Sequence, residues 1–390
     1  MNPRVNIPVY LDYNATTPVD VRVFDAMQPY FVELFGNAAS SSHGFGMQAR
    51  EAVDTARQQV ARLIGATPAE IVWTSGSTES INLAIKGAMD CHASRGRHVV
   101  TQATEHKAVL DCCKTLEKNG YDVTMLTPDA DGRVTPGQVA GALRADTVLC
   151  SIMWANNEIG TVQPVREIAQ VCRARGVLFH TDATQAAGKL PVDVVADYVD
   201  LLSLSGHKMY GPKGTGILYV RKGVRLTCQM DGGGHESGFR SGTLNVPGII
   251  GVGAACDLSR RLMQSESARL TVLRDKLENG LIARLGDVVV NGSREHRLPH
   301  VTNLSFPGVN GMDLLPRLTD EVAVSSGSAC TSASMDPSYV LRAIGRADDL
   351  AYASVRFSLG RKTTDAEIDY TLEKVTRVIE ELRAHHVVAV

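Results

Sequence analysis

This sequence lacks the features that mark membrane, secreted and nucleic-acid-binding proteins. No apolar run approaches the roughly 20 residues of a membrane-spanning helix. Residues 1–10 have neither the apolar core of a signal peptide nor the Arg/Ser-rich composition of a transit peptide. The formal net charge is only −2, so the charge gives no reason to expect a nucleic acid or an anionic membrane as a partner. We therefore expect a cytoplasmic protein that binds neither membranes nor nucleic acids directly.

Paired cysteines are missing as well. The eight cysteines are scattered, with no C-x-x-C pair and without the density of a secreted disulfide scaffold. Most of them should therefore be reduced and buried, and we expect no bound metal. The sequence also contains no internal repeat and no low-complexity tract.

What the sequence does contain is the alternation of strands and helices typical of an α/β fold. Its 390 residues, 44% of them hydrophobic, are enough for two domains with substantial cores. Strands are predicted at 71–74, 98–101, 123–126, 148–153, 177–179, 198–204 and 217–220. The clearest helical patterns lie at 48–64, 107–118 and 164–175. This rhythm predicts a mainly parallel seven-stranded sheet with helices on both faces.

After Val246 the pattern changes to that of a smaller α+β domain. Two long helical stretches, at 247–263 and 268–285, are followed by short predicted strands and a last helix. The strands lie at 288–290, 301–306, 322–324 and 354–359, and the helix at 365–383. We place the boundary near residue 262. The large domain is then 16–262, and the small domain is 1–15 together with 263–390.

Lys208 follows the buried strand predicted at 198–204. Ligands of open α/β sheets bind at this strand edge, where partial desolvation lowers the pKa of a lysine and leaves a nucleophilic amine that can form a Schiff base. A lone lysine here is ordinarily a solvated loop residue. Ser205 and His207 flank Lys208, however, and the glycines after it let the backbone approach a ligand. A phosphate-binding P-loop is excluded because Pro212 stands where that motif needs its lysine.

Asp182 follows the neighbouring strand, so we expect it at the same edge as Lys208. A lysine paired with a carboxylate is the arrangement that pyridoxal phosphate requires, because the carboxylate keeps the pyridine nitrogen protonated. Taken alone, Asp182 is as well explained as a helix cap or turn residue. The Ser75–Glu79 turn, which includes Ser77 and Thr78, opens a helix after strand 71–74 and suits a phosphate group. An ordinary helix N-cap explains that turn equally well.

Three further polar residues follow or interrupt predicted strands. His106 has the position to stack on a flat cofactor, although an isolated histidine is more often structural. Asn157 has the position to bind a cofactor or substrate oxygen, or simply to form a turn. Arg356 interrupts a strand pattern and needs a partner for its charge, either a substrate carboxylate or a structural ion pair.

Cys330 differs from the other seven cysteines. It lies in the run of small residues from Ser325 to Ser334, which has no apolar pattern. We expect an exposed, mobile loop there, on which the thiolate of Cys330 can be reached. Cys330 is therefore the candidate nucleophile.

These residues belong to eight short motifs that occur in order along the chain. They are Leu11–Pro18, Thr74–Glu79, Thr104–Lys107, Asn156–Glu158, Asp182–Gln185, Ser205–Lys208, Arg240–Thr243 and Ser325–Ser334. With them the chain resembles the cysteine desulfurases typified by the bacterial housekeeping and nitrogen-fixation enzymes. That family lies within the class-V aminotransferases of the fold-type-I pyridoxal-phosphate superfamily, and the resemblance runs from Val9 to about Arg383.

The resemblance implies a role for each candidate residue. Lys208 holds pyridoxal 5'-phosphate and later moves protons at the substrate Cα. Cys330 attacks the substrate sulfur, and Arg356 binds the substrate carboxylate. The other roles are Asp182 at the ring nitrogen, Gln185 at the ring hydroxyl, His106 stacked on the ring as a catalytic residue, Asn157 beside both cofactor and substrate, and Ser77, Thr78, Ser205 and His207 around the phosphate. Thr243 of the partner subunit reaches the same site in a homodimer.

The resemblance also implies the reaction and its partners. L-Cysteine is converted to L-alanine, and the sulfur remains on Cys330 as a persulfide. The acceptor would be an iron–sulfur cluster scaffold or a tRNA-thiolation protein, with transient ligation of a cluster by Cys330. The sequence departs from the family at Ala38, usually proline, and at Asp231, often histidine. It ends at Val390 without the longer tail with which housekeeping members dock their scaffold, which weakens the case for that scaffold as the partner and leaves room for a specialised role such as nitrogenase cluster assembly.

Two other functions compete with this one. An aminotransferase or selenocysteine lyase has the same fold, and an aminotransferase would not need Cys330. A non-catalytic interaction subunit would bind no cofactor. The presence of Lys208, Asp182 and Cys330 together argues against the interaction subunit.

Overall fold

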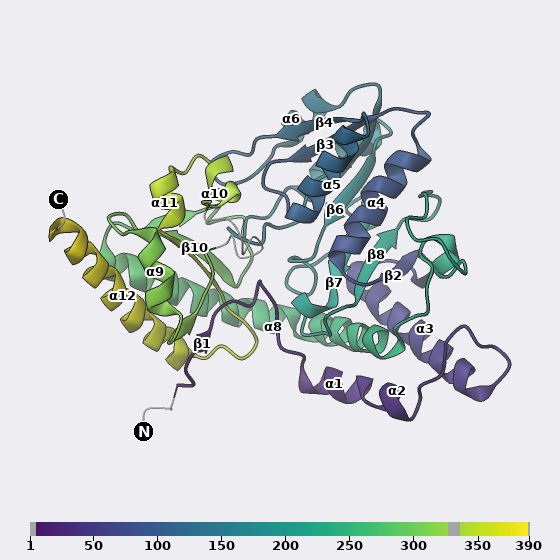
Figure 1. Cartoon of the computed structure of the whole chain (residues 1–390), viewed down its shortest axis with the longest axis horizontal. Coiled ribbons are helices and arrows are strands. Elements are labelled where there is room, and N and C mark those ends of the chain that lie inside the picture. The colour runs from purple at the N-terminus through teal and green to yellow at the C-terminus, as the bar shows by residue number, and fades with distance from the viewer. Residues whose placement is uncertain (1–4, 327–335, 389–390) are drawn as a thin grey trace.

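A seven-stranded sheet forms the centre of the larger part of the molecule (Figure 1). The computed structural model describes residues 5–326 and 336–388. The strands follow the order β2-β8-β7-β6-β5-β3-β4 across the sheet. Their bounds are β2 Ile71–Thr74, β3 His98–Gln102, β4 Asp122–Leu126, β5 Thr147–Ser151, β6 Leu178–Asp182, β7 Leu201–Ser205 and β8 Gly216–Val220. Strands β3 to β7 pair in parallel, and β8 is antiparallel to both its neighbours, which confirms the predicted, mainly parallel sheet.

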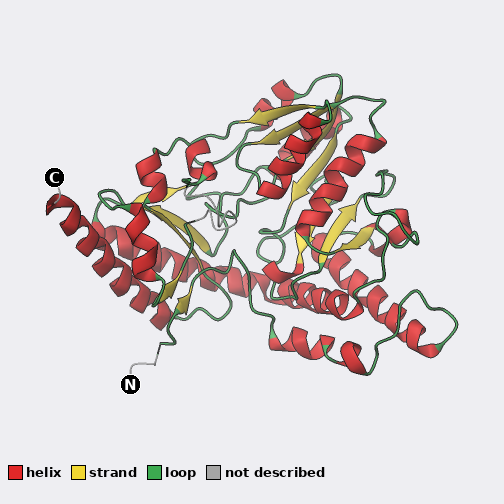
Figure 2. Ribbon diagram, viewed as in Figure 1, coloured by secondary structure: helices red, strands yellow, loops and turns green. Residues whose placement is uncertain are grey.

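Helices cover both faces of this sheet (Figure 2). Alternate strand residues point to opposite faces, so that Val99 packs in the core beneath α4 and α5 while Val100 packs in the core beneath α3 and α7. The helices of this part are α1 Val21–Met27, α2 Pro29–Val32, α3 Gly44–Ile64, α4 Ser77–Cys91, α5 Lys107–Lys118, α6 Pro136–Ala142 and α7 Val165–Ala174. Single 3-10 turns are η1 Pro68–Glu70, η2 Gly206–Lys208 and η3 Glu236–Gly238. Burial on both faces explains why these strands are rich in apolar residues instead of alternating strictly between apolar and polar ones.

The smaller part contains a three-stranded antiparallel sheet of order β12-β10-β9 and a parallel pair, β1 and β11. Its strands are β1 Val9–Tyr10, β9 Val289–Asn291, β10 Val301–Ser305, β11 Val322–Ala323 and β12 Ser354–Ser358. Its helices are α9 Gly311–Leu318, α10 Tyr339–Ala343, α11 Asp348–Tyr352 and α12 Asp365–Val388. Strand and helix types therefore agree with the predicted α+β pattern, whereas the short helices α1, α2, α6 and α9 to α11 had no clear periodic signal.

One long helix, α8 Val246–Leu285, joins the two parts (Figure 1). The prediction of two separate helices was wrong, because the polar run at 264–267 does not end the helix. That run has neither glycine nor proline, and its side chains have polar partners: Ser267 Oγ donates to the Lys189 carbonyl at 2.8 Å, and Glu266 pairs with Arg361. Ile249 of α8 packs in the core of the larger part and Leu277 in that of the smaller part. Helix α8 thus runs through residue 262, and the limits of the two domains stay a prediction.

The N-terminal segment lies between the two parts and contacts both. Val9 pairs with Val322 of the smaller part. Farther along, the Thr17 N–H donates to the carbonyl of His207 at 3.0 Å. This path brings residues 12–17 beside the carboxyl ends of the parallel strands. Within the described ranges, none of the helices combines the length and apolar character needed to cross a membrane.

Candidate active site

A cavity of about 290 Å³ lies at the carboxyl edge of the parallel strands. Asp182 is the last residue of β6, and Lys208 ends the η2 turn that directly follows β7. The cavity is lined by Asn14, Ala15, Ser77, Thr78, His106, Met153, Ala155, Asn157, Asp182, Thr184, Gln185, His207, Lys208 and Arg356. Most of the residues predicted from sequence therefore meet in one place.

Lys208 is held by the N-terminal segment. Its Nζ donates to the carbonyl oxygens of Asn14 and Ala15, each at 2.6 Å. The η2 turn that carries it begins with Gly206, where a Cβ would lie 2.4 Å from Val252 of α8. Only glycine allows this close approach, which seats the turn on α8 and fixes the lysine at the cavity wall.

Asp182 and Gln185 lie next to each other on the turn after β6. The Thr184 N–H donates to Asp182 Oδ1 at 3.0 Å, and the Asp182 carbonyl accepts from the Trp154 N–H at 2.9 Å. Gln185 Nε2 donates to the same Asn14 carbonyl that holds Lys208, at 3.0 Å. The Gln185 amide and the Lys208 amine are therefore linked through the Asn14 carbonyl, whereas the Asp182 carboxylate is held by the turn that carries Gln185.

The first turn of α4 provides a place for an anion. Its N-cap, Gly76, has no side chain to accept from the N–H groups that begin the helix, and Ser77 and Thr78 line the cavity there. His207 completes this end, with Nδ1 3.1 Å from Thr16 Oγ1. Burial, aided by the positive charge of Lys208, lowers the pKa of His207 to about 4. The imidazole is therefore neutral at pH 7 and adds a hydrogen-bonding ring rather than a charge.

Arg356 is buried at the opposite side of the cavity. Its Nη2 donates to Asp12 Oδ1 at 2.6 Å, and Nη1 donates to the Asn157 carbonyl at 3.0 Å. Of the two partners that the sequence left open, the structural ion pair is present. The Nε atom is buried and has no hydrogen-bond partner among the described residues, so the guanidinium keeps the capacity to bind a further acceptor.

His106 lines the cavity and forms the N-cap of α5, where its Nδ1 accepts from the Ala108 N–H at 3.2 Å. Two other predicted residues do not line the cavity of this chain. Ser205 is buried at the end of β7, paired with Gly216 across the sheet, and Thr243 is exposed. Cys330 lies outside the described residues.

The other seven cysteines are all free. Cys112, Cys113, Cys150, Cys172 and Cys256 are buried, and the remaining two are partly exposed. The prediction that most cysteines are reduced and buried is therefore confirmed for this part of the chain.

The cavity fits pyridoxal phosphate. Two buried side-chain oxygens in its wall, Asn157 Oδ1 and Thr184 Oγ1, have no hydrogen-bond partner among the described residues. Buried polar atoms without partners are costly, so they mark a place where a polar ligand or water belongs. Together with the amine of Lys208, the carboxylate of Asp182 and the uncapped start of α4, they match the donor and acceptor set of that cofactor.

Sequence reasoning assigned no individual role to Asn14, Ala15, Met153, Ala155 or Thr184. Met153 and Ala155 show no chemical signal because they contribute shape only. Asn14 and Ala15 lie in the Leu11–Pro18 motif, but they act through backbone carbonyls on a lysine 193 to 194 residues away. No side-chain pattern reveals such a contact.

Comparison with known proteins identifies the family. The model of the family described as "Aminotransferase class-V" matches residues 9–371. A protein of an Anaeromyxobacter species named "Cysteine desulfurase IscS" is 58% identical over 97% of this chain and 94% of its own length. A solved structure titled "NIFS-LIKE PROTEIN" has a TM-score of 0.90 and 37% identity, and covers 96% of this chain and 100% of that one.

A second solved structure, titled "SspA in complex with cysteine", has a TM-score of 0.80 and 38% identity. It covers 90% of this chain and 98% of that one. The matches span both parts of the molecule and the segment that connects them. The chain therefore belongs to the aminotransferase class-V family, in the branch of the cysteine desulfurases.

Proposed function

We propose that this protein is a pyridoxal-phosphate-dependent cysteine desulfurase, which converts L-cysteine to L-alanine and passes the sulfur to an active-site cysteine. The observation that carries the proposal is the meeting of Lys208, Asp182 and Arg356 around one cavity. Relatives at 54 to 58% identity bear the name of this activity. A structural neighbour is titled as a complex with cysteine, which supports the same substrate here.

In this proposal the residues of the cavity wall hold the cofactor. Lys208 binds it through its amine, Asp182 faces the ring nitrogen, Gln185 the ring hydroxyl, and His106 the ring. The α4 start at Ser77 and Thr78, with His207, holds the phosphate, and Ser205, which lies outside the cavity wall, stays a sequence-based candidate for the same role. When bound, pyridoxal phosphate supplies an electron-withdrawing ring that makes the proton on the substrate Cα acidic.

The chain's own residues then bind the substrate and move protons and sulfur. Arg356 and Asn157 orient the amino acid, and the amine of Lys208 takes and returns the proton at the substrate Cα. The Cys330 thiolate attacks the substrate sulfur. The carbon–sulfur bond breaks with its electron pair left on carbon, the sulfur stays on Cys330 as a persulfide, and protonation of that carbon completes L-alanine. No external oxidant or reductant is needed for this transfer.

The assay is product analysis with purified, cofactor-loaded protein. We expect equal amounts of alanine and sulfide from L-cysteine under reducing conditions. An aminotransferase would instead need a 2-oxo acid and would release no sulfide, and a selenocysteine lyase would strongly prefer the seleno-substrate. Either of those patterns, from protein that binds the cofactor, would contradict the proposal.

Replacement of the buried arginine should weaken substrate binding. In Arg356→Gln the charged fork that would hold the substrate carboxylate is lost, so the KM for L-cysteine should rise about 100-fold with a smaller change in kcat. Steady-state kinetics measure this. Arg377→Gln, on the exposed face of α12, is the matched control and should leave KM unchanged. An unchanged KM in Arg356→Gln would leave Arg356 only its ion pair with Asp12.

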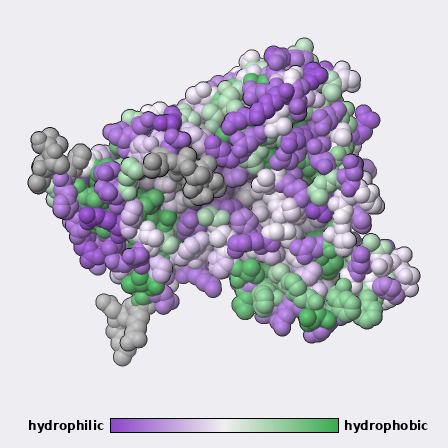
Figure 3. Space-filling model, in the orientation of Figure 1, coloured by the Kyte–Doolittle hydropathy of each residue, from purple (hydrophilic) through white to green (hydrophobic). Residues whose placement is uncertain are grey.

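We also propose a homodimer, whose interface includes an apolar surface over α1, α2 and the start of α3. Figure 3 shows apolar residues gathered over α1 and α2. The exposed apolar residues of this surface are Val21, Phe24, Phe31, Val32, Phe35, Phe45 and Met47. A surface of this kind is unusual on a monomer. Thr243, which does not line its own chain's cavity, would then reach the site of the partner subunit.

The double variant Phe31→Asp/Val32→Asp should shift the protein from dimer to monomer. These side chains are 59% and 72% exposed in the isolated chain, and charges there would be desolvated in an apolar interface. Light scattering after size-exclusion chromatography at micromolar concentration measures the shift. Met125→Asp, at an exposed apolar position of the edge strand β4, should remain dimeric. A double variant that stays dimeric would place the interface elsewhere.

The persulfide needs an acceptor protein. By analogy with relatives named IscS, we propose an iron–sulfur cluster scaffold, or a protein of tRNA thiolation, in the cytoplasm. A transient cluster ligand role for Cys330 belongs to the same proposal. Transfer of labelled sulfur from L-cysteine to purified candidate acceptors distinguishes these acceptors.

A further inference from the structure

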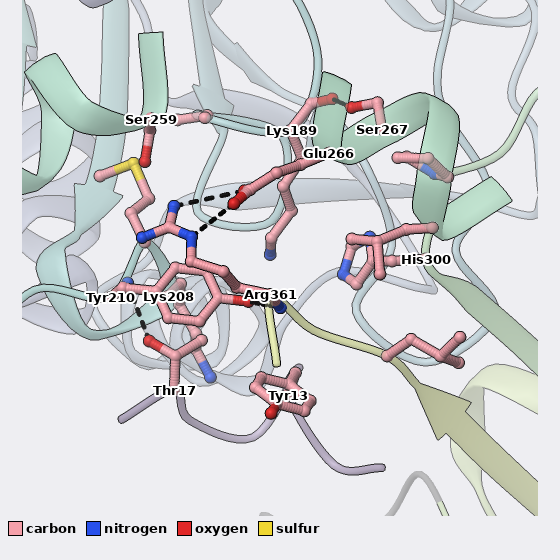
Figure 4. Close-up of a pocket in the computed structure, with 16 residues that line it drawn as sticks. Tyr13, Thr17, Lys189, Lys208, Tyr210, Ser259, Glu266, Ser267, His300 and Arg361 are labelled. Carbon is pink, nitrogen blue, oxygen red and sulfur yellow. Dashed lines mark hydrogen bonds and ion pairs between the residues drawn. The ribbon is translucent and has the colours of Figure 1, made fainter. Parts of the chain in front are cut away.

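A second, small cavity of about 30 Å³ lies behind Lys208, which lines both cavities. Figure 4 shows the side chain of another lysine, Lys189, directed into this space between His300 and Arg361. Lys189 is partly buried and has no role in the function proposed above. It lies four residues after Gln185, on the turn that follows β6.

The backbone of Lys189 is fixed on several sides. Its N–H donates to the Ala186 carbonyl at 3.0 Å, and its carbonyl accepts from Ser267 Oγ of α8 at 2.8 Å. Gly188 before it has a φ of 75° and would place a Cβ 3.0 Å from Ser259, so this turn requires glycine. The backbone that carries the amine of Lys189 is therefore held in a defined position.

The amine of Lys189 donates to Gln185 Oε1 at 2.8 Å. The backbone carbonyl of Asn14 only accepts and the amine of Lys189 donates, so these two partners together fix which end of the Gln185 amide is oxygen. The NH2 end then faces the Asn14 carbonyl, at 3.0 Å, and the large cavity. The same carbonyl accepts from Lys208. Lys189 thus orients the amide that shares an acceptor with Lys208.

The charged groups around Lys189 do not stabilise the protonated form of its amine. Glu266 is the carboxylate among the residues that line the small cavity, and it pairs with Arg361 at 2.5 Å. His300 Nε2 lies 2.8 Å from Asn14 Oδ1 and donates to it, because the Asn14 Nδ2 is directed to the Asn157 carbonyl. Burial, aided by Lys208 and Arg356, lowers the pKa of Lys189 to about 7. Tyr13 and Tyr210 complete the surroundings and are neutral at pH 7.

We propose that Lys189 is a positioning residue: it holds the Gln185 amide with its N–H groups toward the cofactor cavity, and it favours negative charge on the ligand oxygen that this amide meets. The inference rests on the proposed function only for the identity of the ligand as pyridoxal phosphate. Two separate contributions are combined, the fixed direction of a hydrogen-bond donor and, where the amine of Lys189 is protonated, a nearby positive charge. Both contributions stabilise negative charge on the ligand oxygen that the Gln185 amide meets.

The test is a pH titration of the visible absorbance of cofactor-loaded protein without any substrate. In Lys189→Met the Gln185 amide keeps its bond to the Asn14 carbonyl but loses the donor that holds its oxygen end, and the nearby cation is lost, so the titration midpoint should rise by about one pH unit. Lys189→Arg keeps a cationic donor and should restore most of the shift. The matched control is Lys374→Met, which removes a lysine that is 13% exposed on α12 and pairs with Glu321. It should titrate like wild type.

A midpoint in Lys189→Met equal to that of wild type would overturn the proposal and leave Lys189 a purely structural residue. If Lys189→Met fails to fold, Lys189→Gln gives the decision, because it keeps a donor without the charge and should show a smaller rise. The measurement needs cofactor but no cysteine and no turnover. Wild-type protein that binds the cofactor but releases no sulfide from L-cysteine would therefore count against the proposed function and not against Lys189.

Discussion

Lys208→Ala should lose desulfurase activity by about 10²- to 10⁴-fold and lose its firmly bound cofactor. In the proposed reaction the same amine attaches the cofactor and moves the proton at the substrate Cα. The structure shows this amine already at the cavity wall, with two backbone carbonyls 2.6 Å away. Alanine has neither function. Product release and visible absorbance of the purified protein measure the two losses together.

Borohydride reduction of the wild-type protein gives the sharper result, because it fixes the cofactor to the lysine that binds it. Mass spectrometry should find the added mass on the peptide that contains Lys208. Lys222→Ala, an exposed lysine after β8, is the control and should keep both colour and activity. Added mass on Lys189, the other lysine behind the cavity, would contradict the assignment of Lys208 and the positioning role of Lys189 at once.

The carboxyl edge of the sheet was predictable because it follows from strands that are easy to recognise. Strands β5 to β7 are almost wholly buried and rich in apolar residues, and polar residues that end or follow such a strand are expected at the sheet edge. Asp182 and Lys208 were found in this way. Parallel pairing of β6 with β7 then places them together.

Contacts between distant segments were not predictable from the chain alone. The ion pair of Arg356 joins residues 344 positions apart, and nothing in either strand pattern selects Asp12 as the partner. Lys208 is held by backbone carbonyl oxygens, which every residue has, so no residue type marks the contact. In α8, a polar run was mistaken for a break because its partners, such as Arg361, come from a segment about 95 residues later. Local sequence patterns predict the helices, the strands and the residues at the strand ends. Which distant segments contact one another depends on how the two cores pack.

Cys330→Ala should stop both alanine and sulfide formation, with a loss of at least about 1,000-fold. Without the thiolate there is no nucleophile for the substrate sulfur, while the residues of the cofactor cavity are unchanged. The change in cofactor absorbance on adding L-cysteine should therefore persist although turnover stops. Rapid-mixing spectroscopy and product analysis of the same sample separate these two steps.

The described residues that precede Cys330 lie beside Arg356. Ser325 pairs with Arg356 through the backbone, at 2.7 Å from the Arg356 N–H to the Ser325 carbonyl, so this segment begins at the arginine proposed to bind substrate. Cys228→Ala is the control, because Cys228 is free and partly exposed but far along the chain from that arginine; it should remain active. Sulfide release at the wild-type rate from Cys330→Ala would rule out Cys330 as the acceptor. Binding would then still depend on Arg356 and Lys208, and the reaction would be that of a lyase that expels sulfur directly.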